Sequence, residues 1–223
     1  MTYRPTPLRS GYYYHIFNRG VEKRTVFENK TQYRHLLNAI TYYMLDIKNL
    51  KYSYFLELTI SERNKIVYLA NQNPKQPVKL ISYCLMPNHF HLLLRQECDN
   101  GISNFLRKIT DSYTKYFNLK NNRVGPLFQG KFKSRIIESD SHLLHISRYI
   151  HLNPYTNGIT KTIEENENYA WSSIREYIKN DQLICDGSII LSIIGGADNY
   201  KNFVTDQADY QRSLDQIKHL LCE

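Results

Sequence analysis

The chain has 223 residues, with 29 Lys and Arg against 21 Asp and Glu, and 19 Tyr. This length suits one domain with an appendage or two small domains, each able to bury a core. No apolar run approaches the roughly 18 residues of a membrane span, and the N-terminus has no signal-peptide segment. We therefore expect a cytoplasmic protein that does not bind a membrane. The four cysteines are scattered without a Cys-x-x-Cys pair, which argues against a disulfide framework or a zinc knuckle.

The basic charge is concentrated in the first 160 residues. They carry 23 basic and 10 acidic side chains, whereas residues 161–223 carry 6 and 11, so we expect the two parts to have different roles. Residues 104–135 alone hold eight basic side chains and one acid. A charge run is often only a solvated surface, but basic side chains also gain free energy by releasing the counterions of phosphates. The distribution therefore favours a polyanionic partner.

The N-terminal part predicts a strand, a helix and an insertion. Residues 11–18 are aromatic and β-prone, which predicts a first strand. Residues 31–47 repeat apolar side chains at helical spacing. Residues 49–77 are ambiguous, because 52–60 suits either a strand or a helix and the end of the segment suits a turn. We interpret the segment as an insertion.

The middle of the chain predicts a hairpin and a second helix. Two apolar runs, 78–85 and 89–95, are separated by Met-Pro-Asn, which is typical of a tight turn. Apolar side chains then repeat every three or four residues from about 102 to 118, which predicts a helix with one buried stripe. Tyr113 and Tyr116 belong to this stripe, so we assign them to packing.

A basic strand is predicted near residues 130–137. Lys131, Lys133 and Arg135 alternate there with less polar residues. Because side chains alternate across a strand, all three basic groups would lie on one face beside a packed sheet.

The C-terminal part predicts a helix and an acidic extension. Asp140 is a candidate cap for a helix that we expect to end near Pro154. Two acidic, weakly helical stretches follow at about 182–194 and 200–220.

Strands and helices alternate along the chain, but a tight hairpin cannot belong to an all-parallel sheet. We therefore predict an α+β fold, a ferredoxin-like antiparallel sheet with helices packed on it. This domain would span residues 1–178 with the insertion at about 49–77, and residues 179–223 would form an acidic helical C-terminal extension.

The first candidate site is the pair His89 and His91, separated by one apolar residue. On a strand the two imidazoles share a face, and backbones roughly 6.5–7 Å apart allow them to converge on one divalent cation. A pair of histidines hydrogen-bonded to neighbouring groups is the alternative, and the motif alone does not decide between them.

The second candidate site lies on the predicted helix from residue 140. Leu143, Ile146 and Ile150 form its core-facing stripe, as expected at about 100° per residue. Tyr149 and Asn153 lie side by side on an adjacent arc, where the amide oxygen could complete a metal site beside the phenol. The alternative is a boundary tyrosine that packs by its ring, with Asn153 at the helix end before Pro154.

Four segments, in this order and spacing, resemble the REP-associated tyrosine transposases, a branch of the HUH (His-hydrophobe-His) single-tyrosine, IS200-like transposases. The segments are Tyr83-Cys-Leu-Met-Pro-Asn-His-Phe-His-Leu-Leu-Leu94, Gly125-Pro-Leu-Phe-Gln-Gly-Lys-Phe-Lys-Ser134, Ser147-Arg-Tyr-Ile-His-Leu-Asn-Pro154 and Trp171-Ser-Ser173. The similarity covers about residues 8–178. The insertion and the acidic extension match no motif of the family.

The resemblance implies a metal-dependent nuclease and strand-transferase acting on single-stranded DNA beside a hairpin. Tyr149 would attack the phosphorus and leave a 5′-phosphotyrosine link and a free 3′-OH. His89, His91 and Asn153 would hold Mg²⁺ or Mn²⁺. His145, one helical turn before Tyr149, is a candidate second-shell proton acceptor, although a structural or solvent-facing role is the alternative.

The implied partner is single-stranded DNA with repetitive palindromic hairpins, bound by a nucleoid-associated protein that acts as a monomer or a homodimer. Eight basic residues are the expected DNA contacts: Arg107, Lys108, Lys115, Arg123, Lys131, Lys133, Arg135 and Arg148. Two other functions stay open. One is a non-catalytic nucleic-acid-binding module with a ferredoxin-like sheet, and the other is a metal phosphodiesterase that uses water.

Overall fold

The computed structural model describes residues 7–47, 49–72, 75–179, 184–206, 208–209 and 212. The chain divides into two compact units. The first comprises Met1–Tyr12, Asn18–Lys79 and Arg95–Phe132, and the second comprises Tyr13–Phe17, Leu80–Leu94 and Lys133–Glu223.

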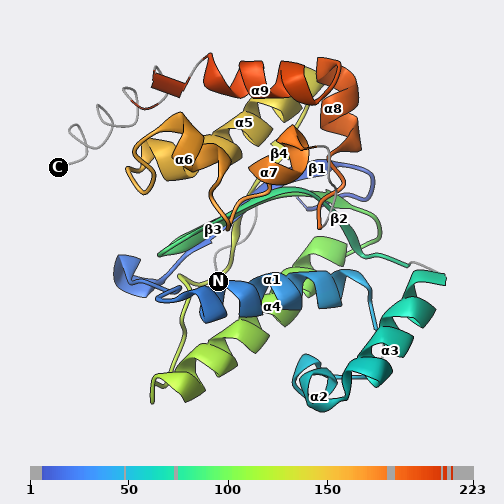
Figure 1. Cartoon of the computed structure of the whole chain (residues 1–223). Helices are drawn as coiled ribbons and strands as arrows, with labels where there is room; N and C mark the ends of the chain where they lie inside the picture. Colours follow the sequence, from blue (N-terminus) through green and yellow to red (C-terminus); the bar gives the residue numbers. More distant parts are fainter. Residues whose placement is uncertain are drawn as a thin grey trace. The chain divides into compact units, whose positions relative to one another are not determined.

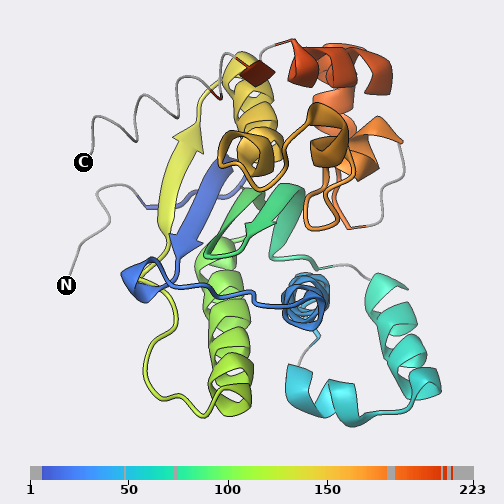
Figure 2. The ribbon, with the colours of Figure 1, turned by 60° about the vertical axis from the view of Figure 1, so that its left-hand side comes forward.

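Four strands form one antiparallel sheet in the order β2-β3-β1-β4 (Figure 2). The strands are β1 (Tyr13–Arg19), β2 (Val78–Met86), β3 (His89–Gln96) and β4 (Lys133–Ile137). A two-residue turn, Pro87-Asn88, joins β2 to β3, because proline and asparagine both favour turn geometry. Helices separate β1 from β2 and β3 from β4 along the chain. The predicted ferredoxin-like antiparallel sheet is therefore confirmed.

The pairing of β1 with β4 determines which side chains share a face. His15 lies opposite Arg135, and Phe17 lies opposite Lys133. Directly opposed residues of paired strands point to the same side, so the two basic side chains are on the face of His15 and Phe17. Both are exposed, as the alternation predicted. The strand begins at Lys133 rather than near 130, because Gly130 has a φ of 55° and cannot continue an extended strand.

The first unit contains two long helices, α1 (Lys30–Met44) and α4 (Gly101–Lys120), which pack against each other (Figure 1). Their apolar stripes are buried as predicted, and Tyr113 is fully buried with its hydroxyl donating to the carbonyl of Val26. Tyr116 stacks on His35 with ring centres 3.8 Å apart. The assignment of both tyrosines to packing is confirmed.

The insertion is helical and consists of α2 (Tyr52–Glu57) and α3 (Ile60–Gln72). The Thr59 amide donates to Glu62, and the Glu62 amide donates to the Thr59 hydroxyl, which is a capping box that starts α3. Buried side chains of α2 pack on those of α1 in a small separate core. The strand alternative for residues 52–60 is therefore wrong.

The second unit carries α5 (Asp140–Thr156), whose ends both differ from the prediction. Ser139, not Asp140, caps the helix, because its hydroxyl accepts the amide of His142 at 3.2 Å. The helix also continues past Pro154. The proline removes one amide donor, but the Asn157 amide still reaches the Asn153 carbonyl, and the Pro154 carbonyl accepts two later amides.

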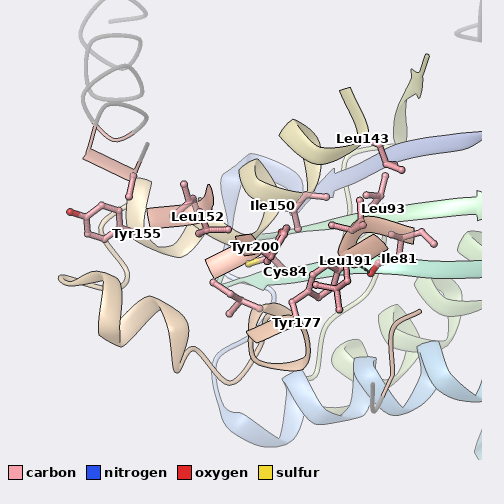
Figure 3. Packing of buried hydrophobic residues seen from close by; sticks show 14 of the residues in the cluster. Ile81, Cys84, Leu93, Leu143, Ile150, Leu152, Tyr155, Tyr177, Leu191 and Tyr200 are labelled. Atoms are coloured by element: carbon pink, nitrogen blue, oxygen red, sulfur yellow. Dashed lines mark hydrogen bonds between the residues drawn. The ribbon is translucent and has the colours of Figure 1, made fainter. Parts of the chain in front are cut away.

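Four short helices follow α5 in the second unit: α6 (Ile163–Glu167), α7 (Ile174–Ile178), α8 (Ser188–Ile194) and α9 (Ala197–Thr205). They share one hydrophobic core with the sheet and α5 (Figure 3). Leu93 enters this core from β3, Ile150 from α5, Leu191 from α8 and Tyr200 from α9. The predicted acidic stretches at 182–194 and 200–220 thus contain helices, although 182, 183, 207, 210, 211 and 213–220 lie outside the described residues. None of the helices in the described ranges has the length and apolar character needed to cross a membrane.

Candidate active site

His89 and His91 lie on β3 with their rings close together and almost perpendicular. The ring centres are 5.0 Å apart at an interplanar angle of 83°, and the residues are 8% and 5% exposed. A metal ion lies about 2.1 Å from an imidazole nitrogen, and that nitrogen lies about 1.2 Å from the ring centre. With an angle of about 90–110° between two such ligands, the ring centres are about 4.7–5.4 Å apart. The observed separation fits two imidazoles on one ion.

Ligands of other kinds would have to complete such a site. Among the residues that the structure describes, no group of three or more His, Cys, Asp or Glu side chains is arranged to hold a metal ion. Side-chain amide, backbone carbonyl, water and phosphate oxygens are hard ligands that suit Mg²⁺ or Mn²⁺.

Each histidine of the pair has a hydrogen-bond partner on one ring nitrogen. His89 Nδ1 is 2.5 Å from Asn88 Oδ1, and His91 Nδ1 is 2.8 Å from His15 Nε2. Metal-binding histidines usually have their second nitrogen held in this way, which fixes the ring and leaves Nε2 for the ion.

His15 is a site residue that sequence reasoning missed. It is 5% exposed, and burial first, then Arg135 and His142, lower its pKa to about 4, so it is neutral at pH 7. A signal existed, because alternation in the first strand separates His15 from the buried neighbours Tyr14 and Ile16. The ferredoxin-like strand order also sets β1 beside β3.

Tyr149 projects from α5 toward the histidines. Its ring centre is 5.6 Å from that of His91 at an interplanar angle of 90°, and 5.7 Å from that of His15 at 74°. The residue is half-buried. Leu143 and Ile150, on the same helix, are buried in the core and hold α5 in place, whereas Ile146, the third member of the predicted stripe, is only partly buried. The structure thus brings the phenol and the imidazoles together from two distant segments.

Asn153 is 2% exposed, and its recorded hydrogen bonds lie within its own helix. Its Nδ2 donates to the Tyr149 carbonyl at 2.8 Å, and its Oδ1 accepts from Asn157 at 3.4 Å. The oxygen, which has a lone pair and only this long contact with Asn157, is the atom suited to a cation.

The predicted DNA contacts fall into two groups. Lys133 and Arg135 belong to the second unit and lie on the sheet face of His15. Arg148, also in the second unit, donates to the Phe203 carbonyl at 3.2 Å and stacks on its ring at 4.2 Å. The other five, Arg107, Lys108, Lys115, Arg123 and Lys131, belong to the first unit.

Two residues of that first-unit group already have protein partners. Lys108 pairs with Asp46 at 3.4 Å, and Arg123 donates to its own loop at Asn118 and Pro126. Arg107, Lys115 and Lys131 are exposed.

His145 is exposed, and its contacts run along α5 and to α9. Arg148 donates to its Nδ1 at 2.9 Å, and its ring lies 5.7 Å from that of Phe203. Burial and the neighbouring Arg148 lower its pKa. These contacts support a structural role more than proton transfer.

A second cluster in the same unit, built around the single histidine His151, is completely buried. His151 is 0% exposed, its Nε2 is 2.7 Å from the Ser173 hydroxyl, and its Nδ1 is 2.7 Å from the Tyr200 hydroxyl. Tyr200 in turn donates to Ser147 at 3.1 Å. Burial lowers the pKa of His151 to about 3. This network ties α5 to α9 and to the Trp171-Ser-Ser173 segment.

Comparison with known proteins identifies a family and a similar fold. The model of the family described as IS200-like transposase matches residues 9–153. A solved structure of a REP-associated tyrosine transposase bound to a REP hairpin superposes with a TM-score of 0.56 and 18% sequence identity, covering 80% of this chain and 86% of that one. Comparison with curated proteins gives no match.

Proposed function

The chain belongs to the IS200-like transposase family, and we propose that it is a metal-dependent endonuclease and strand-transferase that cleaves single-stranded DNA beside hairpins through a covalent tyrosine intermediate. The observation that carries the proposal is the packing of the Tyr149 ring against two imidazoles. One is His91, on the strand that also bears His89, and the other is His15, on the neighbouring strand β1. A phenol beside a possible metal site matches nucleophilic attack on a phosphodiester.

In the proposed reaction the Tyr149 oxygen attacks the phosphorus and loses its proton. The bond from phosphorus to the 3′ oxygen breaks, and that oxygen takes up a proton to become a free 3′-OH. The protein is left linked to the 5′-phosphate. Attack by the 3′-OH of another strand reverses these steps, releases Tyr149 and joins the strands.

A divalent ion, Mg²⁺ or Mn²⁺, is the expected cofactor. His89 and His91 would hold it, with the Asn153 amide oxygen as a further ligand. When bound, the ion withdraws charge from the phosphate and favours ionisation of a phenol whose pKa is ordinarily about 10.

DNA with a hairpin is the expected partner, because the solved relative is a transposase bound to a REP hairpin. Lys133 and Arg135 are the best placed of the predicted contacts, since they share the sheet face of the site. We assign the exposed Arg107, Lys115 and Lys131 to the same role, with less support for the engaged Lys108, Arg123 and Arg148. The proposed location is the cytoplasm, at the nucleoid, and both a monomer and a homodimer are compatible with the proposal.

The test is incubation with labelled, hairpin-bearing single strands and Mn²⁺, followed by a denaturing gel. We expect a band of protein joined to oligonucleotide, abolished by Tyr149→Phe. Tyr116→Phe is the matched control and should keep the band, because the buried Tyr116 hydroxyl has no hydrogen-bond partner to lose. Free 5′-phosphate products without an adduct would instead indicate a water-using phosphodiesterase. Binding without cleavage would indicate a non-catalytic module.

A further inference from the structure

The hydrogen bond between His15 and His91 joins neighbouring strands next to Tyr149. The two nitrogens, Nε2 of His15 and Nδ1 of His91, are 2.8 Å apart, and the ring planes differ by only 20°. Each residue is 5% exposed, so water has little access to compete for the bond. One proton lies between two nitrogens that can each donate or accept, so the bond has two possible orientations.

The orientation of this bond decides what His91 can bind. If His91 donates from Nδ1, its Nε2 keeps a lone pair. If His15 donates instead, the neutral His91 ring carries its proton on Nε2 and that nitrogen cannot ligate a cation.

His89 has no such ambiguity. Its partner is the Asn88 side-chain oxygen, which only accepts, so His89 must donate from Nδ1 and keep the Nε2 lone pair. A shared ion therefore requires the same tautomer at His91, and His15 contacts the Nδ1 atom that determines it.

We propose that His15 is a positioning residue that accepts the Nδ1 proton of His91 and thereby keeps the Nε2 lone pair of His91 available to a divalent ion. The inference rests on the proposed function for the identity of the ligands. It concerns the metal-free protein, however, because the tautomer is set before any ion arrives. Loss of an outer-shell partner of this kind typically costs 10- to 100-fold in metal affinity.

The surroundings of His15 allow the contribution of its ring packing and that of its hydrogen bond to be tested by separate substitutions. The Phe17 ring centre lies 5.1 Å from that of His15 and 5.8 Å from that of His91. Aromatic contacts therefore persist in a His15→Phe variant, which loses only the acceptor. A His15→Gln variant retains an acceptor in its side-chain oxygen.

Nitrogen-15 NMR of histidine-labelled, metal-free wild-type protein at pH 7.5 tests the tautomer without any substitution. We expect His91 to carry its proton on Nδ1 and to present an unprotonated Nε2. A proton on Nε2 of His91 would overturn the inference.

Mn²⁺ binding without DNA, followed by electron paramagnetic resonance, tests the consequence. We expect His15→Phe to weaken binding about 10- to 100-fold and His15→Gln to stay within about threefold of wild type. His35→Phe, a substitution of a half-buried histidine in the first unit, should leave affinity unchanged. Wild-type affinity in a folded His15→Phe protein would overturn the inference, and thermal unfolding reports whether each variant is folded.

The two proposals fail separately. If the wild-type protein forms the Tyr149 adduct but His91 carries its proton on Nε2, only the role of His15 is wrong. If the tautomer and Mn²⁺ binding are as expected but no adduct forms, only the proposed function is wrong.

Discussion

Helix α5 contributes to two clusters of the second unit, one around His89, His91 and His15 and one around His151, and the two differ in their surroundings. In the cluster of His89, His91 and His15, one nitrogen of each candidate ligand is held by a neighbour, and Tyr149 packs at its edge. In the other cluster both nitrogens of His151 are occupied by hydroxyl groups, and the ring has no exposure. Because the histidines of both clusters are buried, burial alone does not distinguish the proposed active site from the network around His151.

Helix geometry explains how one short motif serves both clusters. Tyr149 and His151 are two residues apart, about 200° around the helix, so they point to opposite sides. The phenol goes to the sheet histidines, and the imidazole of His151 goes to α7 and α9. The same motif thus supplies the proposed nucleophile and a brace for the helix that carries it.

Substitutions in the two clusters should differ most in their effect on the rate of DNA cleavage. His89→Ala should lower the rate of DNA cleavage at least about 10²-fold, because a proposed metal ligand is lost, while the protein stays folded and loses less stability than with His151→Ala. Gel assays of cleavage and thermal unfolding measure the two quantities. A variant that cleaves at the wild-type rate would remove His89 from the site.

His151→Ala should have the opposite profile. Removing the ring leaves the buried hydroxyls of Ser173 and Tyr200 without their partner and opens a cavity, so we expect a loss of about 3 kcal/mol in the free energy of unfolding. Urea denaturation measures it, and Ser141→Ala, at an exposed position on the same helix, is the control with little expected change. A loss below about 1 kcal/mol would contradict the bracing role.

A smaller effect should appear in the dependence of stability on pH. His151 has a folded-state pKa of about 3 against an ordinary value of 6.5, so between these values the unfolded chain binds a proton that the folded chain does not. Its contribution is complete above pH 6.5 and is lost as the pH falls. By pH 5 the loss is about 2 kcal/mol. Urea denaturation of wild type and His151→Gln should show a shallower pH dependence in the variant, and parallel curves would argue against a buried neutral imidazole.

The smallest effect concerns the basic side chains beside the site. Lys133→Ala and Arg135→Ala should each weaken binding to single-stranded DNA a few-fold and reduce the slope of log affinity against log salt by about 0.7, if each contacts one phosphate. Fluorescence anisotropy at several salt concentrations measures this slope. Lys161→Ala, at an exposed lysine outside the basic segment, should leave the slope unchanged. Unaltered slopes for both sheet variants would place the DNA elsewhere.

Much of the fold was predictable because its signals are local. An aromatic, β-prone segment identified β1, apolar runs beside a turn identified β2 and β3, and alternation identified β4. Period-3.6 stripes identified α1, α4 and α5. The ends were less predictable. Ser139 and Asp140 are both good caps, and a proline costs a helix one hydrogen bond without always ending it. Residues 52–60 stayed ambiguous between a strand and a helix, although the Thr59 to Glu62 capping box is a sequence signal for the helix that follows.

The candidate site was only partly predictable because it depends on contacts between distant segments. The spacing of His89 and His91 and of Tyr149 and Asn153 indicated two halves of a site, each on one element. His15 comes from a third segment, and its role depends on which strand neighbours β3, which spacing alone does not reveal. For the same reason the structural role of His151 and Ser173 follows from the hydrogen bond between them, which their positions in the sequence do not reveal.

The most direct test of the account is mass spectrometry of the protein after incubation with a hairpin-bearing single strand and Mn²⁺, followed by nuclease and protease digestion. The account predicts one modified peptide, with a 5′-phosphonucleotide on the Tyr149 oxygen. A nucleotide attached to any other residue, or efficient cleavage with no modified peptide, would contradict it.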